Sequence, residues 1–237
     1  MHQIELLDLG LGFIPVLVTM AIMMRWSMSP GRAMIAVLRM LAQLVLIGYL
    51  LNYIFTSEGS LLVILVLSLM LLAASWISLN SVPIPSRWLY LYSLYAIAVG
   101  GVFTLAITTQ GILHLDPWYS PRSLIPIAGM IFSNSMTAIS LAGERFFSEY
   151  EDRADFTYCR DIAYRAALIP VINSLLAVGL VSLPGMMTGQ ILSGVSPLLA
   201  VRYQIMVMLM IFGSAGISAA IFLTLLRRQL TDNRPAN

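Results

Sequence analysis

The chain has 237 residues, of which 59% are hydrophobic and only 10% are charged, and its formal net charge is +2. No segment is polar enough to form a separate soluble domain, so we expect one compact bundle of helices, a single domain over residues 1–237. All 13 basic residues are arginines, which excludes the lysine that a P-loop places on phosphates. Any ATP hydrolysis must therefore come from another polypeptide. The few, scattered charges also exclude nucleic acid as a partner.

Seven long apolar stretches follow one another along the chain, each close to the roughly 20 residues needed to cross a bilayer. Because lipid offers no hydrogen bonds to the backbone, such stretches must be helices. The sequence therefore predicts an all-α, multi-pass membrane protein with seven transmembrane helices. The expected spans are Leu6–Met24, Ala33–Phe55, Ser60–Leu79, Trp88–Leu113, Leu124–Ala142, Ile162–Leu183 and Leu198–Leu226.

The arginines are sorted between alternate joints of these spans. With the N-terminus outside, the outside joints carry only Arg122, and Arg39 and Arg202 lie within or at the edge of spans. Because positive residues favour the cytoplasmic side, this pattern predicts an outside N-terminus and a cytoplasmic C-terminus. The inside joints and tail hold Arg25, Arg32, Arg87, Arg145, Arg153, Arg160, Arg165, Arg227, Arg228 and Arg234.

Two joints differ from the others in length or composition. Gly143–Asp161 is the largest polar insertion and falls on the inside, where it is either a solvated surface loop or a contact for a soluble partner. Residues 184–197 are too broken by proline and glycine for a span, yet too apolar for an ordinary loop. We expect a short re-entrant or interfacial turn on the outer side, with a plain structural connector as the alternative.

Several polar side chains within the spans are candidates for a transport path. Arg39 and Gln43 share one helical face, where they either line a route or hold helices together, unless Arg39 extends to the headgroups. Asn134 and Ser135 in the fifth span and Asn173 in the sixth either line a path or pack helices. Met186 and Met187 are the thioether pair to test first as soft metal ligands.

Catalytic chemistry finds less support in the sequence. Gln110 and His114 share a helical face near Asp116, but no nucleophile is placed beside them. Cys159 and two distant histidines do not make a zinc site. No carboxylate lies in the middle of a predicted span, which favours an external source of energy over proton or sodium coupling. An intramembrane enzyme and a membrane scaffold remain the alternative classes.

Five segments carry a resemblance to the FetB-type ABC transporter permeases, bacterial membrane subunits associated with iron export, with plant relatives linked to aluminium tolerance and sugar-nucleotide transport. The longest, Val178–Gln190, reads VGLVSLPGMMTGQ and is highly specific. The others are Arg39–Leu44 with Gly48–Tyr49, Leu124–Met130 with Asn134–Met136, Arg165–Pro170, and Val201–Ile205.

This resemblance implies the permease subunit of an ATP-driven exporter, in the bacterial plasma membrane and without an ATPase site or cofactor of its own. It implies a homodimer that docks a separate ATPase subunit, which binds ATP and magnesium. Residues 143–161 would be the cytoplasmic coupling loop, with the coupling residues Glu149, Glu151, Asp152, Arg153 and Arg160. The implied cargo is iron or another metal ion, and a small organic, sugar-nucleotide or lipidic substrate is the alternative.

Overall fold

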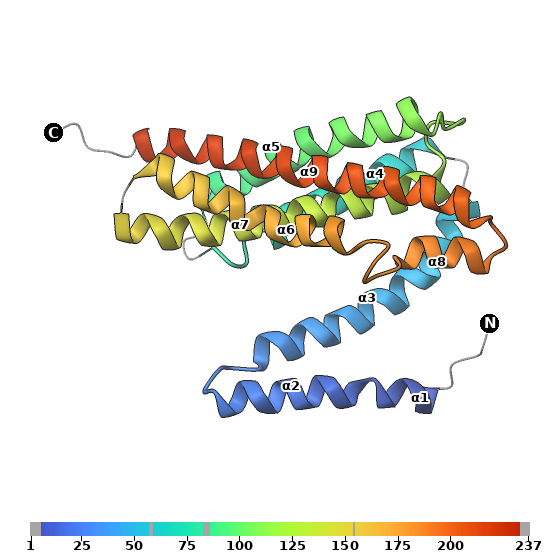
Figure 1. Cartoon of the computed structure of the whole chain (residues 1–237), viewed down its shortest axis with the longest axis horizontal. Helices are drawn as coiled ribbons and strands as arrows, with labels where there is room; N and C mark the ends of the chain where they lie inside the picture. Colours follow the sequence, from blue (N-terminus) through green and yellow to red (C-terminus); the bar gives the residue numbers. More distant parts are fainter. Residues whose placement is uncertain (1–5, 57–58, 83–85, 154, 233–237) are drawn as a thin grey trace. The chain divides into compact units, whose positions relative to one another are not determined.

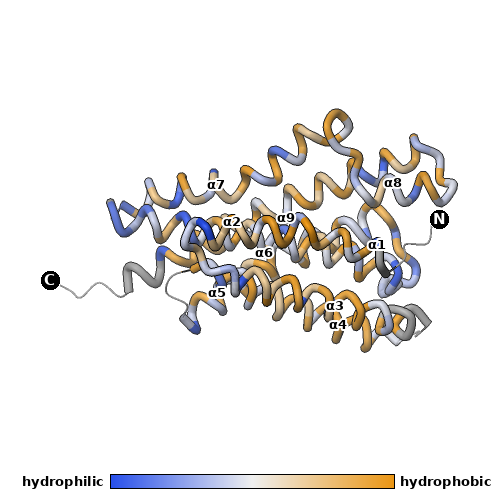
Figure 2. The backbone as a smooth tube through the Cα atoms, turned by 90° about the horizontal axis from the view of Figure 1, so that it is seen from below, coloured by the Kyte–Doolittle hydropathy of each residue, from blue (hydrophilic) through white to orange (hydrophobic). Residues whose placement is uncertain are grey.

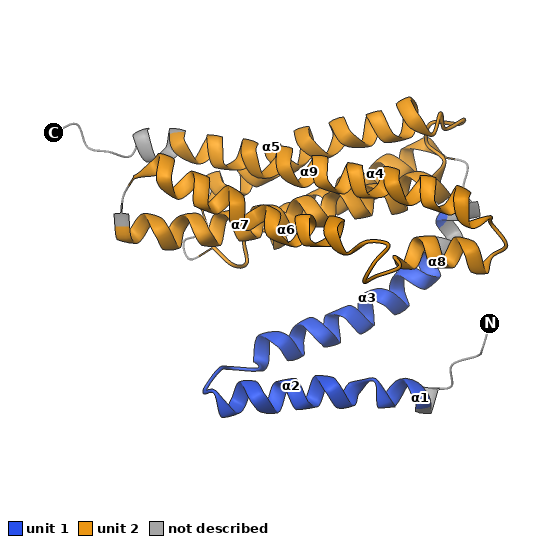
Figure 3. Ribbon diagram, in the orientation of Figure 1, with its two compact units in different colours: residues 1–57 blue, residues 58–237 orange. Residues whose placement is uncertain are grey.

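A computed structural model describes residues 6–56, 59–82, 86–153 and 155–232. Within these ranges the regular elements are helices, apart from one isolated β-bridge between Val178 and Ser182. The all-α prediction is therefore confirmed. The chain divides into two compact units, unit 1 with residues 1–57 and unit 2 with residues 58–237 (Figure 3).

Unit 1 consists of three helices with little buried surface, α1 (Leu6–Leu11), α2 (Phe13–Arg25) and α3 (Gly31–Thr56). The first predicted span is interrupted at Gly12, whose N–H donates to the Leu9 carbonyl at 3.1 Å. Only 6% of the residues in the apolar segment Asp8–Arg25, which covers most of α1 and α2, are buried. In the apolar segment Gly31–Leu50 of α3 none are buried. Side chains this apolar and this exposed belong in lipid or against another protein.

Unit 2 is a bundle of long helices lying side by side (Figure 1). Its central helix, α6, packs against four others: α4, α5, α7 and α9. The elements are α4 (Ser60–Ile77), α5 (Arg87–Ala106), its continuation as the π-helix η1 (Ile107–Ile112), α6 (Pro121–Arg153), α7 (Phe156–Ala177), α8 (Gly185–Leu192) and α9 (Pro197–Asp232).

Small residues set the distance between α5, α6 and α9. A Cβ atom added at Gly100 would lie 2.5 Å from the Oγ of Ser218, and one at Gly101 would lie 2.9 Å from the Phe132 ring. The Ser218 hydroxyl in turn donates to the Oγ of Ser135 at 3.1 Å, and both serines are fully buried. Close packing and hydrogen bonds of this kind are what associate helices in lipid.

A second group of serines fixes the end of α4. The hydroxyls of Ser78 and Ser93 are 2.6 Å apart, joining the end of α4 to α5. The Ser140 hydroxyl of α6 donates to the Ser78 carbonyl at 2.8 Å. The last turn of α4 is therefore hydrogen-bonded to both neighbours, which satisfies a backbone group that the helix itself leaves free.

The expectation that residues 143–161 form a loop is wrong. Helix α6 continues to Arg153, and α7 begins at Phe156. The charges lower the hydropathy of this stretch, but glutamate and arginine are good helix formers. The ion pair between Arg145 and Glu149, 2.6 Å apart and four residues from each other, also supports the helix. The segment is the tip of a helical hairpin.

Residues 178–197 also differ from expectation. The predicted span Ile162–Leu183 ends early, because α7 stops at Ala177 and Gly179 adopts a left-handed φ of +82°. Within the predicted outer turn, 184–197, residues Gly185–Leu192 form the two-turn helix α8, which packs against α9. The turn is thus partly helical.

Six of the described helices are long and apolar enough to cross a membrane. Their apolar segments are Asp8–Arg25, Gly31–Leu50, Ser60–Ile77, Arg87–Ile112, Pro121–Asp152 and Pro197–Arg227. Helix α7 is not among these, because its first turns carry Arg160, Asp161 and Arg165 and leave a short apolar remainder. The seventh span and the orientation of the chain stay predictions.

The glycine contact gives a direct test of the packing. Replacing Gly100 by alanine should lower the free energy of unfolding by about 1–3 kcal/mol, the usual cost of overpacking. The matched control is Gly213→Ala in α9, where an added Cβ meets nothing within 4 Å. Thermal unfolding in detergent is the measurement. Adding Ser218→Ala to the Gly100 variant should restore part of the loss, and equal melting of the two glycine variants would contradict the close contact.

Candidate functional site

One face of α6 exposes oxygen-bearing side chains within its membrane-length segment. Ser133 and Thr137 are exposed and Asn134 is half-buried. Their protons go to backbone carbonyls of the same helix: Ser133 Oγ and Asn134 Nδ2 donate to Met130 at 3.2 and 2.8 Å, and Thr137 Oγ1 donates to Ser133 at 2.9 Å. The hydroxyl lone pairs and the Asn134 amide oxygen remain available as acceptors. We call Ser133, Asn134 and Thr137 the α6 polar face.

Ser135 lies on the opposite side of the same helix. It is fully buried and accepts the hydrogen bond from Ser218 of α9. This geometry is that of a helix–helix contact, one of the two alternatives that the sequence leaves open for Ser135. Its predicted part in a transport path stays a prediction.

The other predicted path residues lie on three different helices. Asn173 is exposed on α7, which packs against α6 and α9. Met186 and Met187 are half-buried on α8. Arg39 and Gln43 are both exposed on α3 of unit 1. Ser133 and Thr137 share the face of Asn134, because their spacing of four residues places them on one side of the helix.

The predicted coupling residues lie at the α6–α7 turn, where hydrophilic residues gather (Figure 2). Glu151 and Asp152 are exposed, and Glu149 is half-buried and paired with Arg145. Arg160 is held by its neighbour Asp161, with Nε and Nη2 at 2.8 and 2.7 Å from one carboxylate oxygen. The side chain of Arg153 lies outside the described residues. The turn therefore exposes carboxylates to any partner at this end of the bundle.

An aromatic cluster underneath the turn joins three helices. Phe146 of α6 is fully buried, with its ring centroid 5.5 Å from Tyr150 and 5.4 Å from Phe156 of α7. Arg227 of α9 places its guanidinium 5.8 Å from the Phe156 ring centroid, within cation–π range. The sequence contained a signal for this cluster, because two phenylalanines at 146–147 are unusual in a solvated loop. The turn is attached to both its own hairpin and α9.

Metal-binding and catalytic side chains are sparse in this unit. Among the described residues no three His, Cys, Asp or Glu side chains are close enough to hold a metal ion. Cys159 is buried in α7. The His114 Nδ1 lies 2.8 Å from the Gln110 carbonyl, so the ring contacts the last turn of its own helix rather than a nucleophile. This contact suits a structural role at the end of η1.

The apolar helices of both units define the protein as a multi-pass helical membrane protein. Over residues 6–231 the chain matches the Uncharacterised protein family UPF0014, and it belongs to that family. The resemblance found in the sequence is thereby confirmed.

Among its relatives, the chain is 36% identical to the Probable iron export permease protein FetB of Escherichia coli, covering 88% of this chain and 82% of FetB. It is 32% identical to the UPF0014 membrane protein YjkA of Bacillus subtilis, over 92% of both chains. The Arabidopsis thaliana Protein ALUMINUM SENSITIVE 3 is 31% identical, over 86% of this chain and 80% of that protein. No solved structure matches the chain.

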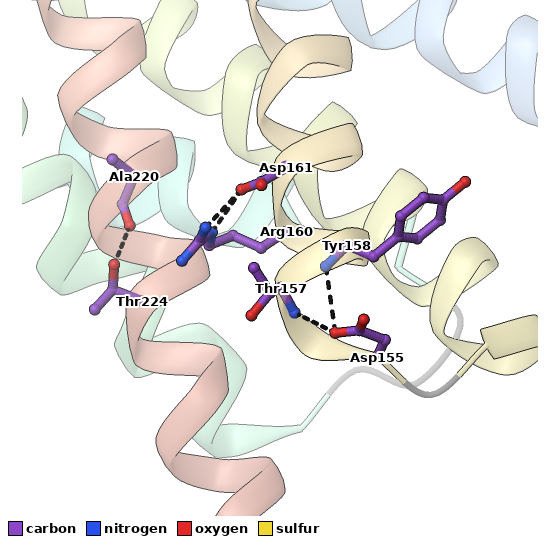
Figure 4. A network of polar contacts seen from close by, with 7 residues as sticks. All are labelled: Asp155, Thr157, Tyr158, Arg160, Asp161, Ala220 and Thr224. Atoms are coloured by element: carbon purple, nitrogen blue, oxygen red, sulfur yellow. Dashed lines mark hydrogen bonds and ion pairs between the residues drawn. The ribbon is translucent and has the colours of Figure 1, made fainter.

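The side chain of Asp155 caps α7 directly after the joint with α6. Asp155 precedes α7 and accepts hydrogen bonds at Oδ1 from the N–H groups of Thr157 and Tyr158, at 2.9 and 3.4 Å (Figure 4). A side-chain cap of this kind satisfies donors that the first helical turn leaves free.

Replacing Asp155 by alanine should therefore cost about 1 kcal/mol of stability. It should also speed amide exchange at Thr157 and Tyr158. Asp155→Asn is the matched control, because asparagine caps as well and removes only the charge. Thermal unfolding and hydrogen exchange measure both effects. An asparagine variant as unstable as the alanine variant would show that the charge, not the cap, stabilises the turn.

Proposed function

We propose that this chain is the permease subunit of an ATP-driven exporter, powered by a separate ATPase subunit, and that it exports iron or another metal ion. The observation that carries the proposal is the similarity to FetB along most of both chains, since that relative is named a probable iron export permease. By the same reasoning we propose a multi-pass location in the bacterial plasma membrane, a homodimer, and ATP and magnesium bound by the partner.

The continuity of α6 supports a coupling role for the α6–α7 turn. Helix α6 runs without interruption from the polar face at Asn134 to the exposed Asp152. At 1.5 Å per residue this separates the two by about 27 Å. In this proposal, a displacement of the α6–α7 turn by the ATPase is transmitted along one helix to the α6 polar face. The aromatic contacts of Phe146 with Phe156, and of Phe156 with Arg227, carry α7 and α9 along with it.

The chemistry of the polar face favours a substrate that needs only oxygen acceptors. Ferrous iron accepts oxygen ligands, and neutral hydroxyl and amide oxygens hold a cation more weakly than carboxylates do. Weak contacts suit transport, because a cation must also leave each site. In the proposed path, the cation or its hydration water contacts Ser133, Asn134 and Thr137.

A small organic or sugar-nucleotide substrate is the second candidate. Side chains with free acceptor lone pairs also bind the hydroxyl groups of such a molecule. An assay that measures metal content and a labelled sugar nucleotide in the same vesicles separates the two substrates.

Docking of the ATPase at the α6–α7 turn is testable by charge reversal. Co-expressed with a candidate ABC ATPase subunit, the chain should yield a complex. Asp152→Lys should lower co-purification several-fold, because a lysine in place of an exposed carboxylate removes the charge complementarity of the proposed contact. The matched control is Asp116→Lys, an exposed aspartate in the joint before α6, at the other end of that helix. A complex lost with Asp116→Lys and retained with Asp152→Lys would invert the proposed orientation, and failure to isolate any complex would contradict the ATPase partnership.

The polar face is testable by separating transport from stability. Asn134→Leu keeps the size of the side chain and removes its oxygen, so export should fall several-fold while the melting temperature changes little. The contrasting variant is Ser218→Ala, which removes the hydrogen bond to Ser135 and should cost about 0.6 kcal/mol of stability with export retained. Cellular iron content and thermal unfolding are the measurements. Parallel losses of export and stability in Asn134→Leu would assign this asparagine to packing instead.

A further inference from the structure

A groove of about 510 Å³ lies between α4 and α5 in unit 2, and Leu124 and Phe132 of α6 also line it, whereas the α6 polar face does not. One wall is the α4 face that includes Ile64 and Leu71, and the other is the α5 face that includes Val102 and Ala106. Each wall extends about 10 Å at the rise of an α-helix. Ile64 and Val102 are 45% and 50% exposed, so the groove opens sideways, where a membrane helix meets lipid.

Among the mostly large apolar side chains that line the groove are three smaller ones beside a distorted helix. Ser68, Ala106 and Thr109 line it where larger residues would fill it. Thr109 belongs to η1, and π-helical turns often occur at functional sites. The hydroxyls of Ser68 and Thr109 donate to carbonyls of their own helices at 2.8 and 2.9 Å. Their protons are therefore not available to an occupant, and the middle of the groove is effectively apolar.

Polar groups with free capacity occur only toward one end. Gln110 is exposed there, as is the Trp118 side chain in the joint before α6. Arg122 follows in the first turn of α6 and is exposed. It makes no ion pair with any residue that the structure describes. At this end η1 stops and α6 begins, so these three side chains lie near the ends of two membrane-length helices, where tryptophan and arginine commonly contact headgroups.

We propose that this groove binds one acyl chain of a phospholipid, with the lipid phosphate at Arg122. The apolar walls accept the chain, and the Gln110 amide and Trp118 indole N–H donate to the ester oxygens. A metal ion does not suit the groove, because its walls carry no charge. The site is separate from the proposed transport path, since the α6 polar face does not line the groove.

Photolabelling tests the proposal on the full-length chain in nanodiscs. The probe is a phospholipid with a diazirine near the end of one acyl chain, and mass spectrometry locates the label. Label should concentrate on α4 and α5 beside the groove. Ala106→Phe should abolish most of it, because the ring fills the groove from an exposed position. The matched control is Ala73→Phe, exposed on the opposite face of α4 and not part of the groove, which should label as the wild type does.

A second variant tests the phosphate contact without changing the groove. Arg122→Gln should weaken phospholipid labelling about five-fold, as expected for one basic residue near lipid phosphates. The same variant should leave labelling by a diacylglycerol probe, which has no phosphate, unchanged. Uniform labelling of all lipid-facing helices, or groove labelling that survives Ala106→Phe, would overturn the proposal. A change of oligomeric state in Ala106→Phe with wild-type labelling would assign the groove to a second copy of the chain instead.

Discussion

The close approach of α5, α6 and α9 at Gly100, Ser135 and Ser218 is the contact on which the rest of unit 2 depends. Lipid tails are as apolar as leucine, so no hydrophobic force drives helices together within a bilayer. What remains is dispersion, which fades within an ångström of separation, and hydrogen bonding between helices. Because α6 is held here, both its exposed polar face and its distant turn have fixed positions on one continuous helix.

Exposure, rather than polarity alone, separates candidate path residues from packing residues. Thr104 and Thr108 are as polar as Thr137, yet both are buried and donate to carbonyls four residues earlier. Such back-bonding lets a hydroxyl reside in a span without any partner on another helix. Asn134 and Ser135 are adjacent in sequence and point about 100° apart around α6, which leaves Asn134 half-buried and Ser135 fully buried. Only the exposed side leaves acceptor oxygens for a substrate.

Hydropathy was enough to predict nearly every helix, because each helix must expose or bury a long apolar surface. It failed where helix and membrane do not coincide: α6 continues through Glu149 to Arg153, since charge ends a span but not a helix. The cap at Asp155 is a local signal that could have located the turn. The phenylalanine pair at 146–147 signals burial, but its partners Phe156 and Arg227 and the α4–α5 groove could not be predicted, because they depend on which helices are neighbours. A groove is defined by small side chains on facing helices, and one sequence does not pair them.

Helix α5 links the tight contact to the groove, because the two lie on its opposite faces. Gly100 faces α9, whereas Val102 and Ala106, about half a turn away, face the groove. Helix α5 is therefore tightly packed on one side and open on the other. An acyl chain in the groove supplies the missing contacts and, by binding only the folded state, stabilises it by mass action. Lipid binding and close helix packing then act on the same helix, so a change in either alters the stability of the packing between α5 and α9. Helix α9 in turn contacts α6 through the hydrogen bond between Ser218 and Ser135.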